Sequence, residues 1–290
     1  MVLYCLDDKG SWGKSLQSAA KARGIETCLF QSSITTKPND FLFARVNQGN
    51  PRMEVEKRLV RDANCKLIIS LKDTAEYEDK LAQTAAYGEF MPRTLLIRDS
   101  RAAQNAIDTF SFPFVSKAKT GSASCNVRLI TNVEQANNEI KAVFGEGLSV
   151  PHRLGEHSQR GYLIWQDFLP GNDYDYRVCK IGRYIMILRR GNRDGVPFAS
   201  GSGRTEAVEE LTPETQAVYD FSENFFSTTG TKWCGIDVVR DYRYARWCLL
   251  ETTIGWKQTA YANCRFFGTD FVGSQMWDLV ANEIELGVFA

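Results

Sequence analysis

The chain has 290 residues, of which 43% are apolar, so it can bury a sizeable core, and its length predicts two or three compact units. Its 35 basic and 35 acidic residues cancel, so no field over the whole molecule would recruit nucleic acid or an anionic membrane. No run approaches the roughly 18 apolar residues of a membrane span, no basic leader opens the sequence, and the eight cysteines form no C-x-x-C pair; we predict a soluble cytoplasmic protein with no membrane partner.

The N-terminal part, residues 1–90, alternates strand and helix patterns. An apolar run at 2–6, a helical pattern at 12–23 and a strand at 25–30 predict the opening of a parallel α/β layer. Further strands are predicted at 41–46 and 67–70, and further helices at 53–63 and 73–87. The loop after the first strand has only two residues between Gly10 and Gly13, whereas a phosphate loop needs four, so a Gly-rich turn before a basic helix start is the favoured interpretation. A phosphate loop and a substrate contact are the alternatives.

The middle part, residues 91–163, holds a small-residue loop between two predicted strands. The strands cover 112–117 and 126–130, and the loop covers 120–124. Its backbone N–H groups can approach phosphate oxygens because no bulky side chain intervenes, and Lys117 supplies a cation nearby. An ordinary hairpin turn is the alternative interpretation. Residues 145–160 are the least structured segment by composition.

The C-terminal part, residues 164–290, returns to strand patterns. Arg177 begins one predicted strand, and Arg189 and Arg190 end the next, so a hairpin would bring them to the same end. Forked guanidinium donors there can hold a carboxylate or a phosphoryl group; solvated surface arginines are the alternative.

Two acidic residues lie at matching positions of the last predicted hairpin, residues 234–256. Asp237 and Glu251 belong to two apolar runs that a short polar connection joins. Antiparallel pairing of these runs would bring both carboxylates to one surface, and such oxygen ligands suit Mg²⁺ that carries nucleotide phosphates.

The order of several short motifs resembles that of the ATP-grasp carboxylate–amine ligases, closest to the branch of ribosomal-protein glutamate ligases and glutathione synthetases. The motifs are D-K-L-A-Q before M-P-R-T, F-P-F-V-S-K with G-S-A-S, W-Q-D-F-L, D-Y-R-V, I-L-R-R, L-T-P-E, G-I-D-V-V-R-D and L-L-E. No single motif is specific, but their shared order and spacing cover most of the chain.

The resemblance implies a role for each matching residue. It implies that Lys80 and Lys117 contact the nucleotide and that the loop of Gly121, Ser122, Ala123 and Ser124 closes over the triphosphate. It implies that the backbone of Gln166, Asp167, Phe168 and Leu169 reads the adenine edge. It further implies that Arg177, with Arg189 or Arg190, neutralises the transferred phosphoryl group, and that Asp237 and Glu251 hold Mg²⁺, or Mn²⁺ in its place.

The chain departs from the family pattern at two positions. The family usually has Asn two residues after the second metal carboxylate, where this chain has Thr253, whose hydroxyl is a weaker metal ligand than an amide carbonyl. The family also often has Asn in the mobile loop before the metal strands, where this chain has Ser200 or Gly201.

These patterns predict an α/β protein of ATP-grasp architecture. We expect an N-terminal parallel α/β domain at 1–90, a small antiparallel lid at 91–163 and a larger antiparallel α+β domain at 164–290. The expected activity is ATP-dependent ligation of a carboxylate to an amine or thiol through an acyl phosphate, with a small molecule or peptide as carboxylate and an amine as acceptor. The alternatives are a nucleotide-binding module without catalysis and a ligase with a macromolecular acceptor, such as a protein tail, a peptide or a nucleic-acid base. An oligomer is compatible with each of these functions.

Overall fold

A computed structural model describes residues 1–6, 11–46, 53–76, 79–120, 126–152, 155–192 and 204–289 of the chain. Its N-terminal layer is a parallel sheet in the order β2-β1-β3-β4, as the alternating strand and helix patterns predicted. The elements of this layer are β1 (Val2–Leu6), α1 (Ser11–Ala22), β2 (Glu26–Phe30), β3 (Phe41–Phe43), α2 (Met53–Asp62) and β4 (Lys66–Leu67). The strands predicted at 41–46 and 67–70 are therefore longer in the prediction than in the structure.

The helix predicted at 73–87 is wrong as a single element. The structure has α3 (Leu71–Glu76) and a separate α4 (Lys80–Tyr87). Asp79 begins α4, because its side chain accepts hydrogen bonds from the backbone N–H groups of Leu81 and Ala82. This cap makes Lys80 the first residue of α4.

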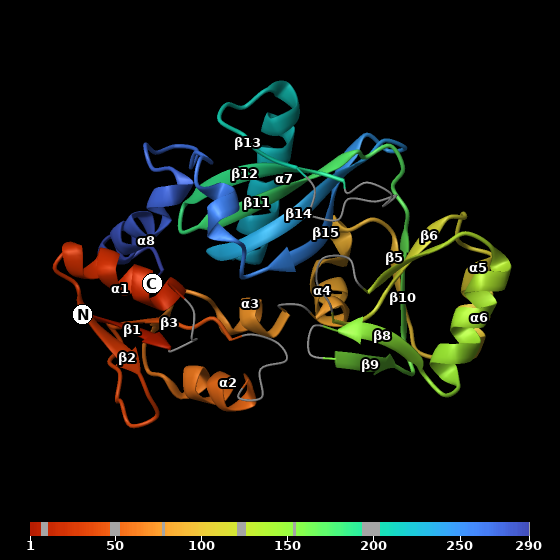
Figure 1. The fold of residues 1–290 in the computed structure, drawn as a ribbon, viewed down its shortest axis with the longest axis horizontal. Coiled ribbons are helices and arrows are strands. Elements are labelled where there is room, and N and C mark those ends of the chain that lie inside the picture. Colours follow the sequence, from red (N-terminus) through yellow and green to blue (C-terminus); the bar gives the residue numbers. More distant parts are fainter. Residues whose placement is uncertain are drawn as a thin grey trace.

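The middle of the chain forms an antiparallel sheet in the order β5-β10-β6-β7, covered by α5 and α6 (Figure 1). Its elements are β5 (Thr94–Ile97), α5 (Ser100–Ile107), β6 (Phe114–Lys117), β7 (Val127–Ile130), α6 (Val133–Phe144) and β10 (Leu163–Asp167). We call this unit the lid sheet. The pairing of β6 with β7 confirms the hairpin predicted around the small-residue loop. The prediction of an irregular segment at 145–160 is wrong, since β8 (Leu148–His152) and β9 (Gly155–Gln159) form an antiparallel hairpin there.

The last part of the chain forms an antiparallel sheet of five strands in the order β13-β12-β11-β14-β15. Its elements are β11 (Tyr174–Ile181), β12 (Tyr184–Gly191), β13 (Thr205–Ala207), α7 (Pro213–Thr229), β14 (Trp233–Asp241) and β15 (Arg246–Thr253), followed by α8 (Met276–Glu285). One face of this sheet packs against α7 through a cluster that includes Val178, Ile187 and Phe225. β15 lies at one edge of the sheet, and α4 lies beside it (Figure 1).

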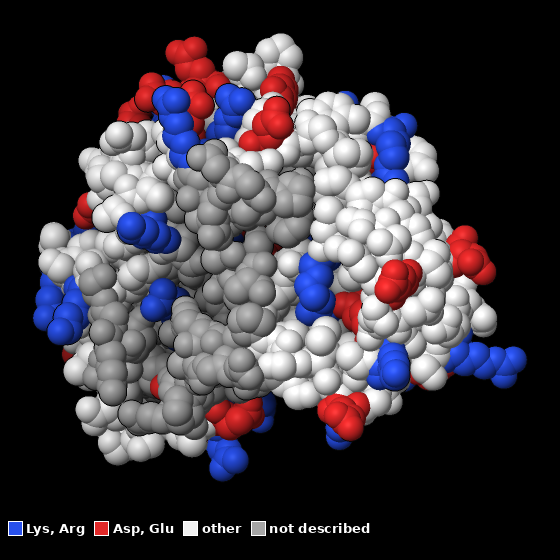
Figure 2. Space-filling view, turned by 45° about the vertical axis from the view of Figure 1, so that its right-hand side comes forward, with Lys and Arg blue, Asp and Glu red and all other residues white. Residues whose placement is uncertain are grey.

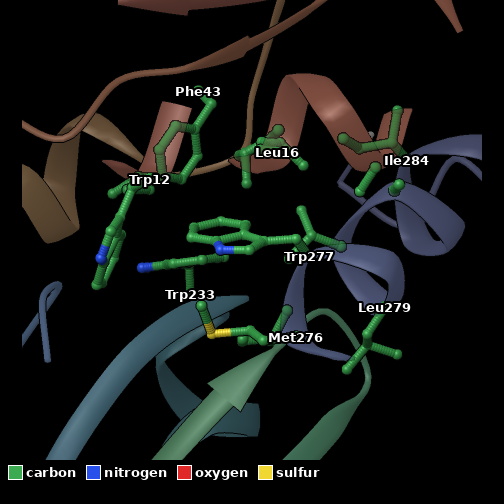
Figure 3. Close-up of a cluster of buried hydrophobic side chains, with 14 of the residues drawn as sticks. Trp12, Leu16, Phe43, Trp233, Met276, Trp277, Leu279 and Ile284 are labelled. Atoms are coloured by element: carbon green, nitrogen blue, oxygen red, sulfur yellow. The ribbon is translucent and has the colours of Figure 1, made fainter. Parts of the chain in front are cut away.

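An aromatic cluster joins the N-terminal layer to the five-stranded sheet and α8. It contains Trp12 of α1, Phe43 of β3, Trp233 of β14, Trp277 of α8 and Trp256 after β15, and Figure 3 shows four of these rings meeting between the elements. Trp233 stacks on Trp256 with 5.4 Å between ring centroids, while Trp12 meets Trp277 edge to face at 5.5 Å. This buried packing fixes the N-terminal layer against the sheet that carries the candidate site.

The charges on the surface are mixed. Figure 2 shows Lys, Arg, Asp and Glu side chains interspersed over the described part of one face, in keeping with the zero net charge. Within the described ranges, no helix has the length and apolar content of a membrane span.

Candidate active site

The two carboxylates predicted to converge do lie opposite each other. β14 pairs antiparallel with β15, and in this register Asp237 faces Glu251, with a shift in register directly after Asp237. Residues opposite each other across a strand pair project to the same face of the sheet. Asp237 is buried, whereas the side chain of Glu251 keeps 32% of its surface exposed. The predicted juxtaposition is therefore confirmed, with Glu251 as the more accessible of the two.

Two arginines reach Asp237 from the neighbouring strands. Arg177 on β11 lies opposite Asp237 and donates to it twice, from Nε and from Nη2, the second bond measuring 2.7 Å. Arg190 on β12 brings its Nη2 within 2.8 Å of Asp237 Oδ2. Gly235 leaves room for the side chain of Arg177 beside that of Thr253. A Cβ at Gly235 would lie 2.9 Å from Thr253 Cγ2 and 3.4 Å from Arg177 Cδ.

Asp175 completes this network, although no sequence motif singled it out. It lies opposite Arg190 on β11 and accepts a bidentate pair from that guanidinium, at 2.7 Å from Nε and 2.6 Å from Nη2. In the sequence, Asp175 belongs to the tyrosine- and aspartate-rich run D-Y-D-Y, and only its two-residue spacing from Arg177 could have placed both on one face of a strand.

The two buried aspartates differ in their affinity for protons. Burial raises the pKa of Asp237, but the guanidinium groups of Arg177 and then Arg190 outweigh burial and hold this pKa well below its usual range. Burial raises the pKa of Asp175 to about 6, because its bonds with Arg190 compensate only in part and the charge of Asp237 adds to the shift. Asp237 is thus a fixed anion near neutral pH.

Arg189, the alternative partner of Arg177 in the sequence analysis, lies on the other face of the sheet. Neighbouring residues of a strand point to opposite faces, so Arg189 is directed away from Arg190 and Asp237. Its guanidinium lies 3.9 Å from the ring centroid of Tyr174 and 3.6 Å from Glu206. The structure brings Arg177 and Arg190 together and leaves Arg189 outside the cluster.

Two buried lysines approach β15 from its open side. Nζ of Lys80, at the start of α4, lies 3.5 Å from Glu251 Oε2. Nζ of Lys117, at the end of β6, donates to the carbonyl oxygen of Leu250 at 3.3 Å. Burial lowers the pKa of Lys117 to about 8; Lys80 lowers it further, while Glu251 opposes the shift. The two lysines predicted from separate motifs therefore converge on one stretch of strand.

The segment predicted to read adenine runs from the lid sheet to the five-stranded sheet. Gln166 is buried in β10 and donates to Thr94 Oγ1 at 2.8 Å, and Asp167 lies 3.2 Å from Nη2 of Arg243. Phe168 is half-buried, and Leu169 packs on the five-stranded sheet. The adenine contact of this segment stays a prediction. The predicted phosphate loop, 121–124, lies outside the described residues.

The carboxylates of this site suit a magnesium ion that is also bound by phosphate oxygens. They are too few to bind the ion by protein ligands alone. Mg²⁺ in nucleotide sites commonly takes one or two carboxylates plus phosphate oxygens and water. Asp237 and Glu251 are such a pair, although both oxygens of Asp237 already accept from arginines, so Glu251 is the more available ligand. The described residues contain no group of three or more His, Cys, Asp or Glu suited to a metal. The hydroxyl of Thr253 donates to the carbonyl oxygen of Gly255 at 2.9 Å and accepts from its N–H at 3.2 Å, so a local turn already engages it.

The cluster as a whole has more cations than carboxylates. Within the described part of the chain it combines four cationic side chains with three carboxylates, namely Lys80, Lys117, Arg177 and Arg190 with Asp175, Asp237 and Glu251. An excess of buried donors around a partly exposed carboxylate suits an anionic ligand that brings its own metal ion, such as a nucleotide polyphosphate.

Comparison with known proteins supports the predicted ATP-grasp fold. No protein-family model matches the chain, and no curated protein matches it in sequence. Among solved structures, it is similar to a RimK-domain ATP-grasp protein from Sphaerobacter thermophilus, with a TM-score of 0.61, 15% identity and coverage of 98% of this chain and 100% of that one.

Two further similar structures were solved with a bound precursor. The ATP-grasp ligase PsnB, in complex with a minimal precursor, Mg and ADP, matches with a TM-score of 0.63, 15% identity and 98% coverage of both chains. The macrocyclase MdnC from Microcystis aeruginosa, bound to its precursor peptide MdnA, matches with a TM-score of 0.62 and 12% identity over 99% of this chain and 100% of that one. These likenesses confirm the predicted ATP-grasp fold.

Proposed function

We propose that this ATP-grasp chain is an ATP-dependent ligase that joins a carboxylate to an amine or thiol through an acyl phosphate and releases ADP and phosphate. Fold alone does not imply activity, so the proposal depends on the site. Its main support is the convergence of Lys80, Lys117, Arg177 and Arg190 on the hairpin where Asp237 faces Glu251. These side chains come from α4, β6, β11 and β12, and only the folded chain assembles them.

Each group has a role that its position supports. The ammonium groups of Lys80 and Lys117 bind nucleotide phosphates, and the guanidinium groups of Arg177 and Arg190 stabilise the negative charge that develops on the transferred phosphoryl group. Glu251 and Asp237 hold Mg²⁺, which when bound neutralises the terminal phosphates and orients them for attack. Catalysis then depends on position and electrostatics, and it needs no nucleophilic side chain from the protein.

We further propose a peptide as the carboxylate or the acceptor. The neighbours PsnB and MdnC were solved with precursor peptides, which makes a peptide substrate the first class to test for this chain. A carboxylate and an amine on the same peptide would give a macrocycle, and a free amine would give a modified side chain or terminus.

The experiment is a measurement of Mg²⁺-dependent ADP release with panels of acidic peptides, small carboxylates and amines, followed by the mass of the product. We expect a product lighter by one water than its two substrates. In Glu251→Gln we expect ADP release to fall by at least about a thousandfold while the protein still folds, because one metal carboxylate is lost. Full turnover in Glu251→Gln would contradict the assignment of this site.

A second candidate function is nucleotide binding without catalysis, which the local hydrogen bonds of Thr253 favour. A protein of this kind would bind Mg–ADP but release no ADP from ATP with any acid and amine pair. Calorimetric binding of Mg–ADP, measured beside the turnover assay, separates the two functions.

A further inference from the structure

Side chains bind the backbone groups along the outer edge of β15, where a further strand of the sheet would otherwise pair. An edge strand presents backbone N–H and C=O groups that a neighbouring strand would otherwise pair. At Thr252, both groups bind the side-chain amide of Gln83: the N–H donates to Oε1 at 3.0 Å, and the carbonyl oxygen accepts from Nε2 at 3.1 Å. Lys117 donates to the carbonyl oxygen of Leu250, two residues earlier. The amide of Gln83 thus does for β15 what a peptide group of a sixth strand would do.

Gln83 sits one turn after Lys80 on α4, and residues three apart on a helix share a face. Thr252, its partner on β15, directly follows Glu251. The same face of α4 therefore meets two consecutive residues of β15, with Lys80 Nζ 3.5 Å from Glu251 and Gln83 on the backbone of Thr252. Gln83 has only 1% of its surface exposed, so water does not compete for these bonds.

α4 is also attached at both of its ends. Its first backbone N–H, from Lys80, donates to the carbonyl oxygen of Lys119 at 2.8 Å, next to the end of β6. Its last residue, Tyr87, packs on Phe225 of α7 with 5.1 Å between ring centroids. Between these ends, the two hydrogen bonds of Gln83 join the middle of α4 directly to the backbone of the strand that carries Glu251.

We propose that Gln83 is a positioning residue of the nucleotide site: its two hydrogen bonds to Thr252 fix α4 against β15 and thereby hold the ammonium group of Lys80 beside Glu251. This role rests on the proposed function, because it acts on the nucleotide through Lys80. Gln83 itself touches neither the nucleotide nor the metal.

The test is a double-mutant cycle on the affinity of the full chain for ADP with Mg²⁺, measured by calorimetry. Gln83→Met keeps the volume of the side chain and removes both hydrogen bonds, and we expect it to weaken binding about tenfold. In a chain that already carries Lys80→Met, the same change should weaken binding by less than about twofold, because residues that act as a unit are not additive.

Gln159→Met is the matched control. Gln159 is also 1% exposed and donates to a backbone carbonyl, that of Tyr162 at 3.1 Å, but it lies in the hairpin beside the lid sheet. We expect its affinity for Mg–ADP to stay within about twofold of the wild type, since the loss of one buried amide elsewhere does not move Lys80. Equal losses in Gln83→Met and Gln159→Met would show a general loss of stability and overturn the positioning role.

Amide hydrogen exchange at Thr252 tests the contact without any ligand. We expect slow exchange in the wild type and faster exchange in Gln83→Met. Fast exchange in the wild type, or additive losses in the double-mutant cycle, would overturn the role of Gln83 alone. A wild-type chain that binds no Mg–ADP would overturn the proposed function, while the exchange result would still decide whether Gln83 holds β15.

Discussion

Two ion clusters in this protein combine buried and partly exposed groups of the same kinds and differ in their balance of charge. Near the lid sheet, Arg128 donates from Nε to Glu139 at 2.8 Å, Trp165 donates to the other oxygen of Glu139 at 2.9 Å, and Gln159 accepts from Arg128 at 2.9 Å. One cation meets one carboxylate there, and neutral groups take the remaining bonds.

The cluster around β14 and β15 is unbalanced and shared. Asp237 accepts from two arginines, and Arg190 donates to two carboxylates. Two lysines add positive charge near Glu251, which is partly exposed. A balanced ion pair contributes little net stability. An excess of cations is costly without an anionic ligand, so the imbalance of charge, and not burial or pairing alone, is what supports the proposal of a nucleotide site in this cluster.

Among the variants that compare the two clusters, the largest effect is expected at Arg190, which binds two carboxylates. Arg190→Lys keeps a cation beside Asp175, but a lysine has no planar fork with which to bind both Asp175 and Asp237. We expect ADP release to fall about a hundredfold, the scale on which one donor to a developing charge matters. The rate is measured at saturating ATP, with the melting temperature as a check on folding, and a rate near that of the wild type would remove Arg190 from the site.

The next effect concerns charge at Lys117. Its pKa of about 8 means that it loses its proton as the pH rises through that value, so we expect the affinity for Mg–ADP to decrease above about pH 8, by up to about tenfold per pH unit. Lys117→Met should bind ADP weakly at all pH values and lose this dependence. Calorimetric titrations from about pH 7 to about pH 9.5 test this, and the same slope in both proteins would contradict it.

The balanced cluster should respond in stability alone. Arg128→Lys shortens the reach to Glu139 and Gln159, and we expect it to lower the free energy of unfolding by about 1 kcal/mol, as for the loss of one buried hydrogen bond. Urea denaturation measures this change. ADP release by the folded variant should stay within about twofold of the wild type, and a loss as large as that of Arg190→Lys would end the distinction between the clusters.

The smallest effect is expected at Arg189, which is on the opposite face of the sheet. Arg189→Ala removes an exposed pair with Glu206 and a contact with Tyr174, which together contribute at most about 1 kcal/mol to stability. ADP release should change by less than about twofold, as a direct comparison with Arg190→Lys in the same assay will show. A large loss would mean that the site extends to both faces of the sheet.

The sequence predicted most of the architecture because apolar runs and turn residues are local signals. The pairing of Asp237 with Glu251 followed from two such runs and a short connection. The hairpin at β8 and β9 was missed because its composition is polar and weakly patterned, and the break before α4 was missed because the helical spacing of apolar residues continues past Asp79.

The parts of the site that the sequence did not reveal depend on long-range contacts. Asp175 belongs to the site only through Arg190, which lies opposite it across a hairpin. Gln83 binds the backbone of Thr252, 169 residues away, and a backbone partner leaves no trace in the identity of a side chain. The choice of Arg190 over Arg189 required only the alternation of side chains along a strand, provided that the register was known.

The aromatic cluster between the N-terminal layer and α8 gives the protein an internal optical reporter. Trp12, Trp233, Trp256 and Trp277 have ring centroids between 5.4 and 6.2 Å apart in their contacts, close enough for their indole transitions to couple. Their combined signal in near-ultraviolet circular dichroism depends on the relative orientation of rings from separate elements. The junction between the N-terminal layer and the five-stranded sheet can therefore be followed spectroscopically, without a label, in the same strand that carries Asp237.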